Sequence, residues 1–276
     1  MLPCISEATT LPASFAEDVA NFASASCPRM EVWLTKLEKH LESHSADATR
    51  RLLADKGVQV VAASYQGGLL LSQGQQRQAH FDHFRRRLDI CGELGIGILN
   101  LVADFAGKIE QTDLERAVVS LKQAAQWAEA YSVRLGLEFR AGGSFCASLD
   151  TALWLIDTAD EPNLGVCLDV FHYYTGPSKF DDLDLLRPER LVFVQVCDLA
   201  GVPRELAGDS DRVLPGDGDF RLEPIIAKLQ AIGYTGPVSL EVLNPTLWQV
   251  KPTQVLELGM AAMRRLLGLE QPSAKK

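Results

Sequence analysis

Gly165-Val166-Cys167-Leu168-Asp169 is a short apolar run that ends in a carboxylate. A run of this length and composition is typical of a buried β-strand. Three other runs in the second half of the chain are built in the same way, each with one polar residue at its end. They are Leu135-Gly136-Leu137-Glu138, Leu191-Val192-Phe193-Val194-Gln195 and Val238-Ser239-Leu240-Glu241. We therefore expect Glu138, Asp169, Gln195 and Glu241 to be the last inward-facing side chains of four strands.

These runs belong to an alternation of short apolar and longer amphipathic stretches that continues along the chain. The alternation is that of βα units, and counting gives eight strands. The pattern predicts an α/β protein with the (β/α)₈ TIM barrel fold, in which chemistry takes place where the strand ends converge. The expected strands are Leu2 to Ser6, Arg29 to Leu34, Val58 to Ala63, Ile96 to Val102, Arg134 to Glu138, Leu164 to Asp169, Leu191 to Cys197 and Pro237 to Glu241.

The length of the chain suits a single barrel. The 276 residues, 47% of them hydrophobic, are enough for one barrel domain, whose usual size is about 250 residues. No linker or low-complexity block interrupts the series, so we predict one domain over residues 1–270 and a short tail at 271–276. Helical patterns are clearest at Gln75 to Gly92, Thr112 to Tyr131, Leu149 to Ala159, Leu222 to Gly233 and Gln254 to Leu267.

Strand parity supports one shared site. Side chains alternate between the barrel interior and the helix layer. If Glu138, Asp169 and Glu241 point inward, small residues such as Gly136 and Ser239 point inward beneath them and leave room for a ligand. The alternative for any single carboxylate is a loop cap or a salt bridge, but that alternative is less economical for four polar ends together.

Composition excludes several function classes. The formal net charge is −9, which disfavours nucleic-acid binding because such proteins need clustered Lys and Arg. No apolar stretch approaches the roughly 20 residues that span a bilayer. The six cysteines lack CxxC spacing and the start of the chain lacks a secretory pattern, so we expect a reduced, cytoplasmic protein. Pairing into a homo-oligomer is compatible with the sequence.

Several motifs resemble those of the xylose isomerase-like TIM barrels. This superfamily includes sugar epimerases, inosose isomerase and dehydratase, hydroxypyruvate isomerase and endonuclease IV. The start, Ser6-Glu7-Ala8-Thr9-Thr10-Leu11, is similar to that of the inosose isomerases. The other matching motifs are Leu137-Glu138-Phe139, Gly165 to His172, Arg212-Val213-Leu214-Pro215-Gly216-Asp217-Gly218, and Gly233-Tyr234-Thr235-Gly236 followed by Val238 to Glu241.

The resemblance implies one divalent metal ion held by Glu138, Asp169, Gln195 and Glu241. Most relatives carry a His where this chain has Gln195. Three carboxylates and one amide form an all-oxygen shell, which suits Mn²⁺ or Mg²⁺ better than Zn²⁺ or Co²⁺, although the latter two stay as alternatives.

The resemblance also implies that His172 and Arg212 contact substrate oxygens. A His that satisfies a loop carbonyl and an Arg on the surface are the alternatives. Arg140 is a weaker candidate, and Glu7 is expected either to reach a substrate hydroxyl or to cap the turn after it. Trp33 and Tyr65 could wall the pocket or simply pack.

A metal beside two carboxylates suits proton transfer next to a carbonyl group. We expect an isomerase or epimerase of a small unphosphorylated keto-polyol, such as an inosose-like cyclitol ketone or a ketose. Glu138 and Glu241 would act as acid and base through an enediolate. The alternatives are a dehydratase of inosose or 3-dehydroshikimate, a hydroxypyruvate isomerase-like enzyme, and a non-catalytic sugar-binding or accessory subunit.

Overall fold

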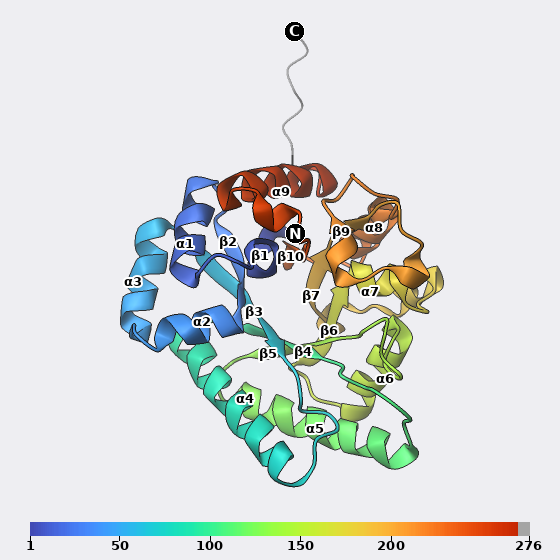
Figure 1. Ribbon diagram of the computed structural model, residues 1–276. Coiled ribbons are helices and arrows are strands. Elements are labelled where there is room, and N and C mark those ends of the chain that lie inside the picture. The colour runs from blue at the N-terminus through green and yellow to red at the C-terminus, as the bar shows by residue number, and fades with distance from the viewer. Residues whose placement is uncertain (270–276) are drawn as a thin grey trace.

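Eight parallel strands form a closed barrel, as the sequence predicts. The computed structural model describes residues 1–269, and the predicted tail at 271–276 lies outside them. The strands follow one another around the barrel in chain order, and the last one pairs with the first to close it (Figure 1). The barrel strands are β1 (Leu2–Ser6), β2 (Arg29–Trp33), β3 (Gln59–Gln66), β4 (Ile98–Val102), β5 (Arg134–Glu138), β6 (Leu164–Asp169), β7 (Leu191–Val196) and β10 (Pro237–Leu240).

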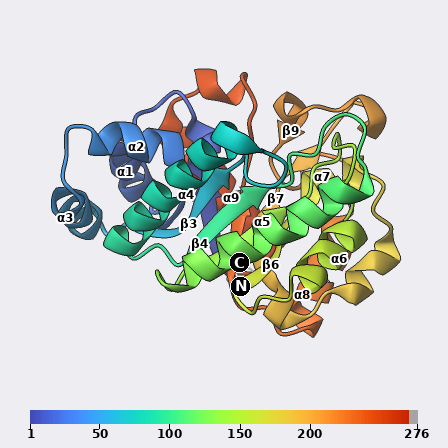
Figure 2. The same ribbon diagram turned by 90° about the horizontal axis from the view of Figure 1, so that it is seen from below.

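Helices surround the barrel, and the five predicted ones are present (Figure 1). Figure 2 shows α5 and α6 lying side by side on the outside of the strands. The helices are α1 (Phe15–Ser24), α2 (Leu34–Leu41), α3 (Ala46–Lys56), α4 (Gly74–Leu94), α5 (Gln111–Glu129), α6 (Leu149–Ala159), α7 (Val170–Thr175), α8 (Leu222–Ala231) and α9 (Pro252–Leu266). Among the described residues, no helix is both long enough and apolar enough to cross a membrane.

Local sequence signals explain where several helices begin and end. Ser14 caps α1, where it exchanges hydrogen bonds with Glu17. Gly57 and Gly95 end α3 and α4 in the left-handed conformation, with φ of 65° and 71°, which glycine adopts without steric cost. These turns return the chain to the amino-terminal end of the barrel for the next strand.

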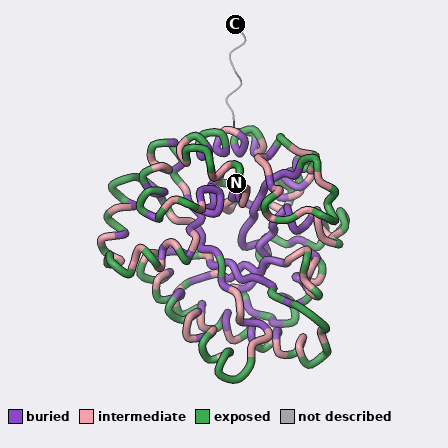
Figure 3. Tube along the Cα trace, in the orientation of Figure 1, coloured by how far each residue is buried: buried purple, intermediate pink, exposed green. Residues whose placement is uncertain are grey.

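Two apolar regions stabilise the barrel. The larger one lies between the strands and the helices, and the smaller one fills the barrel interior around Cys4, Ala62, Cys167 and Phe193. The buried part of the chain accordingly concentrates at the centre of the molecule (Figure 3).

The strand bounds differ from prediction in one place that affects the site. Strand β3 continues from the predicted end at Ala63 as far as Gln66. This extension includes Ser64, whose side chain is buried, and Tyr65, which lies at the mouth of the barrel. Because Ser64 and Gln66 are polar, the prediction from apolar runs ended this strand too early.

Candidate functional site

The four predicted strand-end residues lie at the carboxyl end of the barrel. Glu138 and Asp169 are the last residues of β5 and β6, Gln195 is the penultimate residue of β7, and Glu241 follows β10 directly. Asp169 is paired with Gln195 in the register of β6 and β7. All four are buried, Asp169 and Gln195 completely. The geometry therefore gathers these side chains at one end, as parity predicts.

Arg212 lies among these carboxylates rather than on the surface. Its guanidinium forms a two-pronged pair with Asp169, with Nη2 to Oδ2 at 2.7 Å and Nη1 to Oδ1 at 3.3 Å. It also contacts Glu241 Oε2 at 3.4 Å and Asp209 Oδ1 at 2.8 Å. Only 1% of Arg212 is exposed. Burial lowers the pKa of Arg212, but the surrounding acids, led by Asp169, outweigh this effect and raise it well above its usual value.

A short hairpin aims Arg212 at the site. Strand β8 (Asp198–Leu199) pairs antiparallel with β9 (Arg212–Val213). The Asp198 carboxylate accepts hydrogen bonds from the backbone N–H groups of Leu199, Gly216 and Phe220 at 2.9–3.0 Å. A Cβ atom on Gly218 would lie 2.4 Å from Asp198 Oδ1, so this glycine of the Arg212 to Gly218 motif permits the loop to close on Asp198. Figure 2 shows β9 at the end of the barrel opposite the N-terminus, where the strands finish.

His172 completes the cluster. It lies in the short helix α7 that follows Asp169, and it is 3% exposed. Its Nε2 is 3.4 Å from Glu138 Oε1 and 3.7 Å from Asp169 Oδ2. Neither ring nitrogen has a hydrogen-bond partner among residues 1–269, so the alternative of a His that satisfies a loop carbonyl is wrong. A buried ring without partners is poised for a ligand that comes from outside the chain.

Three buried donor residues at this site could hold a metal ion, and the group contains His172 instead of the predicted Gln195 and Glu241. One ligand atom each from Glu138, Asp169 and His172 lie within 4.8 Å of one another. Burial raises the pKa of Glu241 well above its usual value, and the carboxylates of Glu31, Asp169 and Glu138 add to this, while Arg212 opposes it. One guanidinium thus faces an excess of buried carboxylates, and a divalent cation would relieve their mutual repulsion.

Gln195 points its amide across the barrel interior. Its Nε2 donates to Glu31 Oε1 at 2.8 Å, and its Oε1 accepts from the Cys167 thiol at 3.2 Å. The structure thus places Gln195 beside the carboxylate cluster but joins it by hydrogen bonds to residues deeper in the barrel. Its role as a fourth metal ligand stays a prediction.

Glu31 is a site residue that the sequence prediction missed. It lies in the middle of β2 and is fully buried. Burial raises the pKa of Glu31 to about 7 and Glu138 adds to the rise, while its hydrogen bonds lower it. The available signal was a carboxylate at an inward position between the apolar residues Met30 and Val32. The donors to Glu31 are Ser239 Oγ at 2.6 Å, Gln195 Nε2 at 2.8 Å, Asn100 Nδ2 at 3.4 Å and Ser64 Oγ.

Aromatic side chains wall the mouth of the barrel. Trp33 and Tyr65 meet edge to face, with ring centroids 5.2 Å apart, and both line the small pocket above Glu138 and Glu241. Glu7 is fully buried and accepts a hydrogen bond from the Trp33 backbone N–H at 2.8 Å, so it helps to fix this wall. Arg140, which is partly exposed, pairs with Asp209 at 3.2 Å at the rim.

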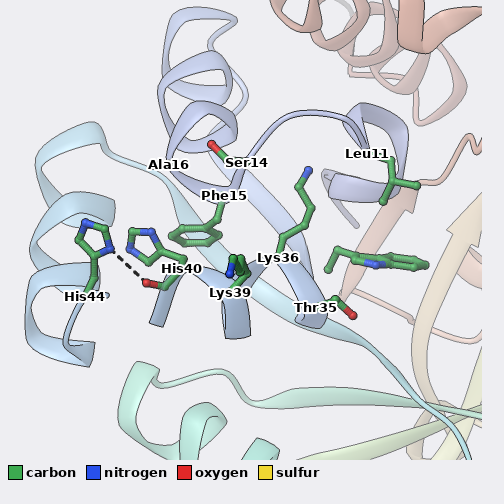
Figure 4. A pocket seen from close by; sticks show the side chains of 10 residues that line it. Leu11, Ser14, Phe15, Ala16, Thr35, Lys36, Lys39, His40 and His44 are labelled. Atoms are coloured by element: carbon green, nitrogen blue, oxygen red, sulfur yellow. Dashed lines mark hydrogen bonds between the residues drawn. The ribbon is translucent and has the colours of Figure 1, made fainter. Parts of the chain in front are cut away.

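A larger cavity lies on the other side of Trp33, between α1 and α2 (Figure 4). His40 lies between Phe15 and His44 in this cavity and stacks on His44 with ring centroids 4.1 Å apart. Lys36 and Lys39, which also line it, are paired with Asp18 and Glu42. Its lining is mostly apolar and excludes the carboxylate cluster, so size alone does not identify the site of chemistry.

Comparison with known sequences agrees with the fold and the cluster. A model of the xylose isomerase-like TIM barrel matches residues 20–266. The chain belongs to this family. Among solved structures, this xylose isomerase-like barrel is similar to the IOLI protein with a bound zinc atom, with a TM-score of 0.91, 22% identity, and coverage of 98% of this chain and 99% of that one. At this identity the likeness concerns the fold.

Two curated relatives differ in the reaction that they are named for. The 3-dehydroshikimate dehydratase of Pseudomonas aeruginosa is 29% identical over 95% of this chain, which spans only 41% of that protein's length. The inosose isomerase of Halalkalibacterium halodurans is 23% identical over 92% of both chains. A D-psicose 3-epimerase structure has the same fold, with a TM-score of 0.78, 19% identity, and coverage of 97% of this chain and all of that one.

Proposed function

We propose that this protein is a divalent-metal-dependent isomerase or epimerase of a small, unphosphorylated keto-polyol, with an inosose-like cyclitol ketone as the first substrate to test. The arrangement of Glu138 and Glu241 around the barrel carries the proposal. Their strands, β5 and β10, are separated by β6 and β7, which bear Asp169 and Gln195. Two carboxylates on either side of one centre suit the removal of a proton from one face of a planar intermediate and its return to the other.

The metal would be held by Glu138, Asp169 and Glu241, with Gln195 as the fourth donor and Mn²⁺ or Mg²⁺ as the preferred ion. When bound, such an ion polarises a carbonyl oxygen and makes the neighbouring C–H more acidic. His172 has free ring nitrogens with which to contact a substrate oxygen. Arg212 pairs with Asp169 and Glu241, and the Trp33–Tyr65 wall offers an apolar face to a sugar ring.

The charges at the mouth favour an uncharged substrate. Arg140 at the rim and the buried Arg212 both line the pocket and both pair with Asp209, so these two cations are already engaged by an acid. A substrate carboxylate or phosphate would have to displace Asp209 from one of them. A neutral polyol needs no such displacement, which supports a cyclitol ketone or ketose over 3-dehydroshikimate.

Dehydration is the second candidate, and His172 is the observation that favours it. Its ring is buried and within 3.4 Å of Glu138, so it is placed to give a proton to a departing hydroxyl group after Glu138 has removed a proton from the neighbouring carbon. The 29% identity with a named dehydratase over nearly the whole chain supports the same alternative.

Proton NMR in D₂O separates these reactions. Metal-free protein would be loaded with Mg²⁺ and incubated with keto-cyclitols and ketoses, with a Glu138→Gln variant as the control. Solvent deuterium in a ketose product without loss of water supports isomerisation. An enone or diketone product supports dehydration, and the absence of exchange in every substrate with the loaded protein would contradict both.

A further inference from the structure

We infer that Glu31 is a positioning residue that orients the amide of Gln195 so that its oxygen, and not its nitrogen, is presented to the metal. The inference rests on the proposed function, since it concerns the same metal. It assigns a role to a buried carboxylate that lies below the predicted ligands and accepts a hydrogen bond from one of them, Gln195.

The contact reaches across the barrel. Strands β2 and β7 are separated by β1 and β10, yet Glu31 Oε1 and Gln195 Nε2 are 2.8 Å apart. Both side chains are fully buried, so water does not compete for this hydrogen bond. The hydrogen bond from Gln195 to Glu31 therefore fixes the orientation of the proposed fourth metal donor from inside the barrel, and not from the loops above it.

Three further residues from other strands hold Glu31 in place. Ser239 donates to Oε2, whereas Ser64 and Asn100 donate to Oε1. Asn100 fits because Gly136 has no side chain, since a Cβ there would lie 2.7 Å from Asn100 Oδ1. The carboxylate therefore cannot turn away from Gln195 without breaking several hydrogen bonds.

The carbonyl oxygen of an amide accepts hydrogen bonds and its NH₂ group donates them, so an accepting oxygen of Glu31 selects the NH₂ group of Gln195. Glu31 Oε1 accepts from the N–H groups of both Asn100 and Gln195, and Oε2 accepts from Ser239, so Gln195 faces Glu31 with its N–H group. The carbonyl oxygen is then directed to the side of β6, where Cys167 donates to it at 3.2 Å and Asp169 ends the strand. A carbonyl oxygen has two lone pairs, and Cys167 uses one, which leaves the other for a cation. The reversed amide would present N–H groups, which cannot bind a metal.

Metal titration by calorimetry tests this role without reference to turnover. Glu31→Met removes the acceptor, Glu31→Gln keeps an acceptor oxygen but removes the charge, and Ser239→Ala removes only a donor to the other oxygen of Glu31. We expect Mn²⁺ to bind about 10–100-fold more weakly to Glu31→Met, the loss typical of a residue that orients a metal ligand. We expect Ser239→Ala to bind within about threefold of wild type, because it leaves Glu31 as the acceptor for Gln195. We expect the same of Glu31→Gln, because the Asn100 N–H group keeps the amide oxygen on the side of Gln195 and the Ser239 hydroxyl can accept from the new N–H group.

Each outcome bears on one claim. Equal affinity in wild type and Glu31→Met would refute the positioning role and leave the proposed function standing. An equal loss in Glu31→Gln and Glu31→Met would also overturn it, because Glu31 would then act through its charge. If Glu31→Met does not fold, Glu31→Gln alone decides between these, since a tenfold loss there contradicts orientation. Failure of wild type to bind Mn²⁺ would overturn the proposed function, and with it this inference.

Discussion

Replacement of Arg212 by Met would test the charge arrangement of the site most directly. The guanidinium is buried against Asp169, which is fully buried, and it also contacts Glu241 and Asp209. Methionine fills similar space without charge. In the metal-free protein, Asp169 and Glu241 would then face each other with no cation between them.

The expected cost follows from the burial of the pair. Removal of one partner of a buried ion pair costs about 3–5 kcal/mol, because the remaining charge is left uncompensated. A chain of this size loses roughly 2–4 °C of Tm per kcal/mol, so the metal-free variant should melt about 10 °C below wild type. A bound divalent cation would replace the missing charge, so excess Mn²⁺ should raise the Tm of the variant more than that of wild type.

Thermal unfolding followed by circular dichroism, with and without Mn²⁺, measures both effects. Arg204→Met is the matched control, because Arg204 lies in the same excursion between β8 and β9 but is exposed and pairs with its exposed neighbour Glu205. A Tm for metal-free Arg212→Met within about 2 °C of the control would refute the reasoning, since a buried pair should cost several times that. Loss of Mn²⁺ binding in the variant would show that Arg212 organises the ligands instead of competing with the metal.

Four further substitutions test other parts of the structure. Glu138→Gln and Glu241→Gln should each lower kcat about 10²–10⁴-fold with unchanged circular dichroism, and a wild-type rate in either would remove that residue from the mechanism. Gln195→His should still bind metal but shift its preference toward Zn²⁺ in competitive titration; an unchanged order of affinities argues against Gln195 as a ligand. Burial raises the pKa of Glu7 well above its usual value of 4.5, so the folded protein retains a proton that the unfolded protein releases, and stability should fall as pH rises above 4.5. We expect Glu7→Gln to reduce the difference in the free energy of unfolding between pH 5.5 and pH 8, as measured by urea unfolding. An equal difference in wild type and variant would contradict this prediction.

The sequence predicted those parts of the site that depend on local pattern. Glu138, Asp169 and Glu241 end apolar runs, and strand parity then places their side chains inside the barrel. Arg212 was found through its motif, and the hairpin with Asp198 explains why that motif directs it inward. The family resemblance and the barrel fold are confirmed, whereas the catalytic, metal and substrate roles, the cytoplasmic location and the oligomeric state stay predictions.

The parts that escaped prediction depend on contacts across the barrel. Glu31 and Gln195 are 164 residues apart in the chain, and no periodicity within β2 indicates which strand its carboxylate will meet. The direction of the Gln195 amide is set by the same contact. The extension of β3 was missed because its last residues are polar, although the closed barrel buries Ser64.

The hairpin of β8 and β9 has a consequence for engineering. Its two strands and the Asp198 carboxylate fix both ends of the excursion that runs from residue 200 to residue 211. Leu206, 77% exposed, lies near the tip of this excursion. Val202 and Ala207 pack against the core, so segments of other lengths grafted between residues 203 and 206 should leave Arg212 and its partner Asp209 undisturbed. New substrate contacts could be selected from such a library at little risk to the barrel beneath.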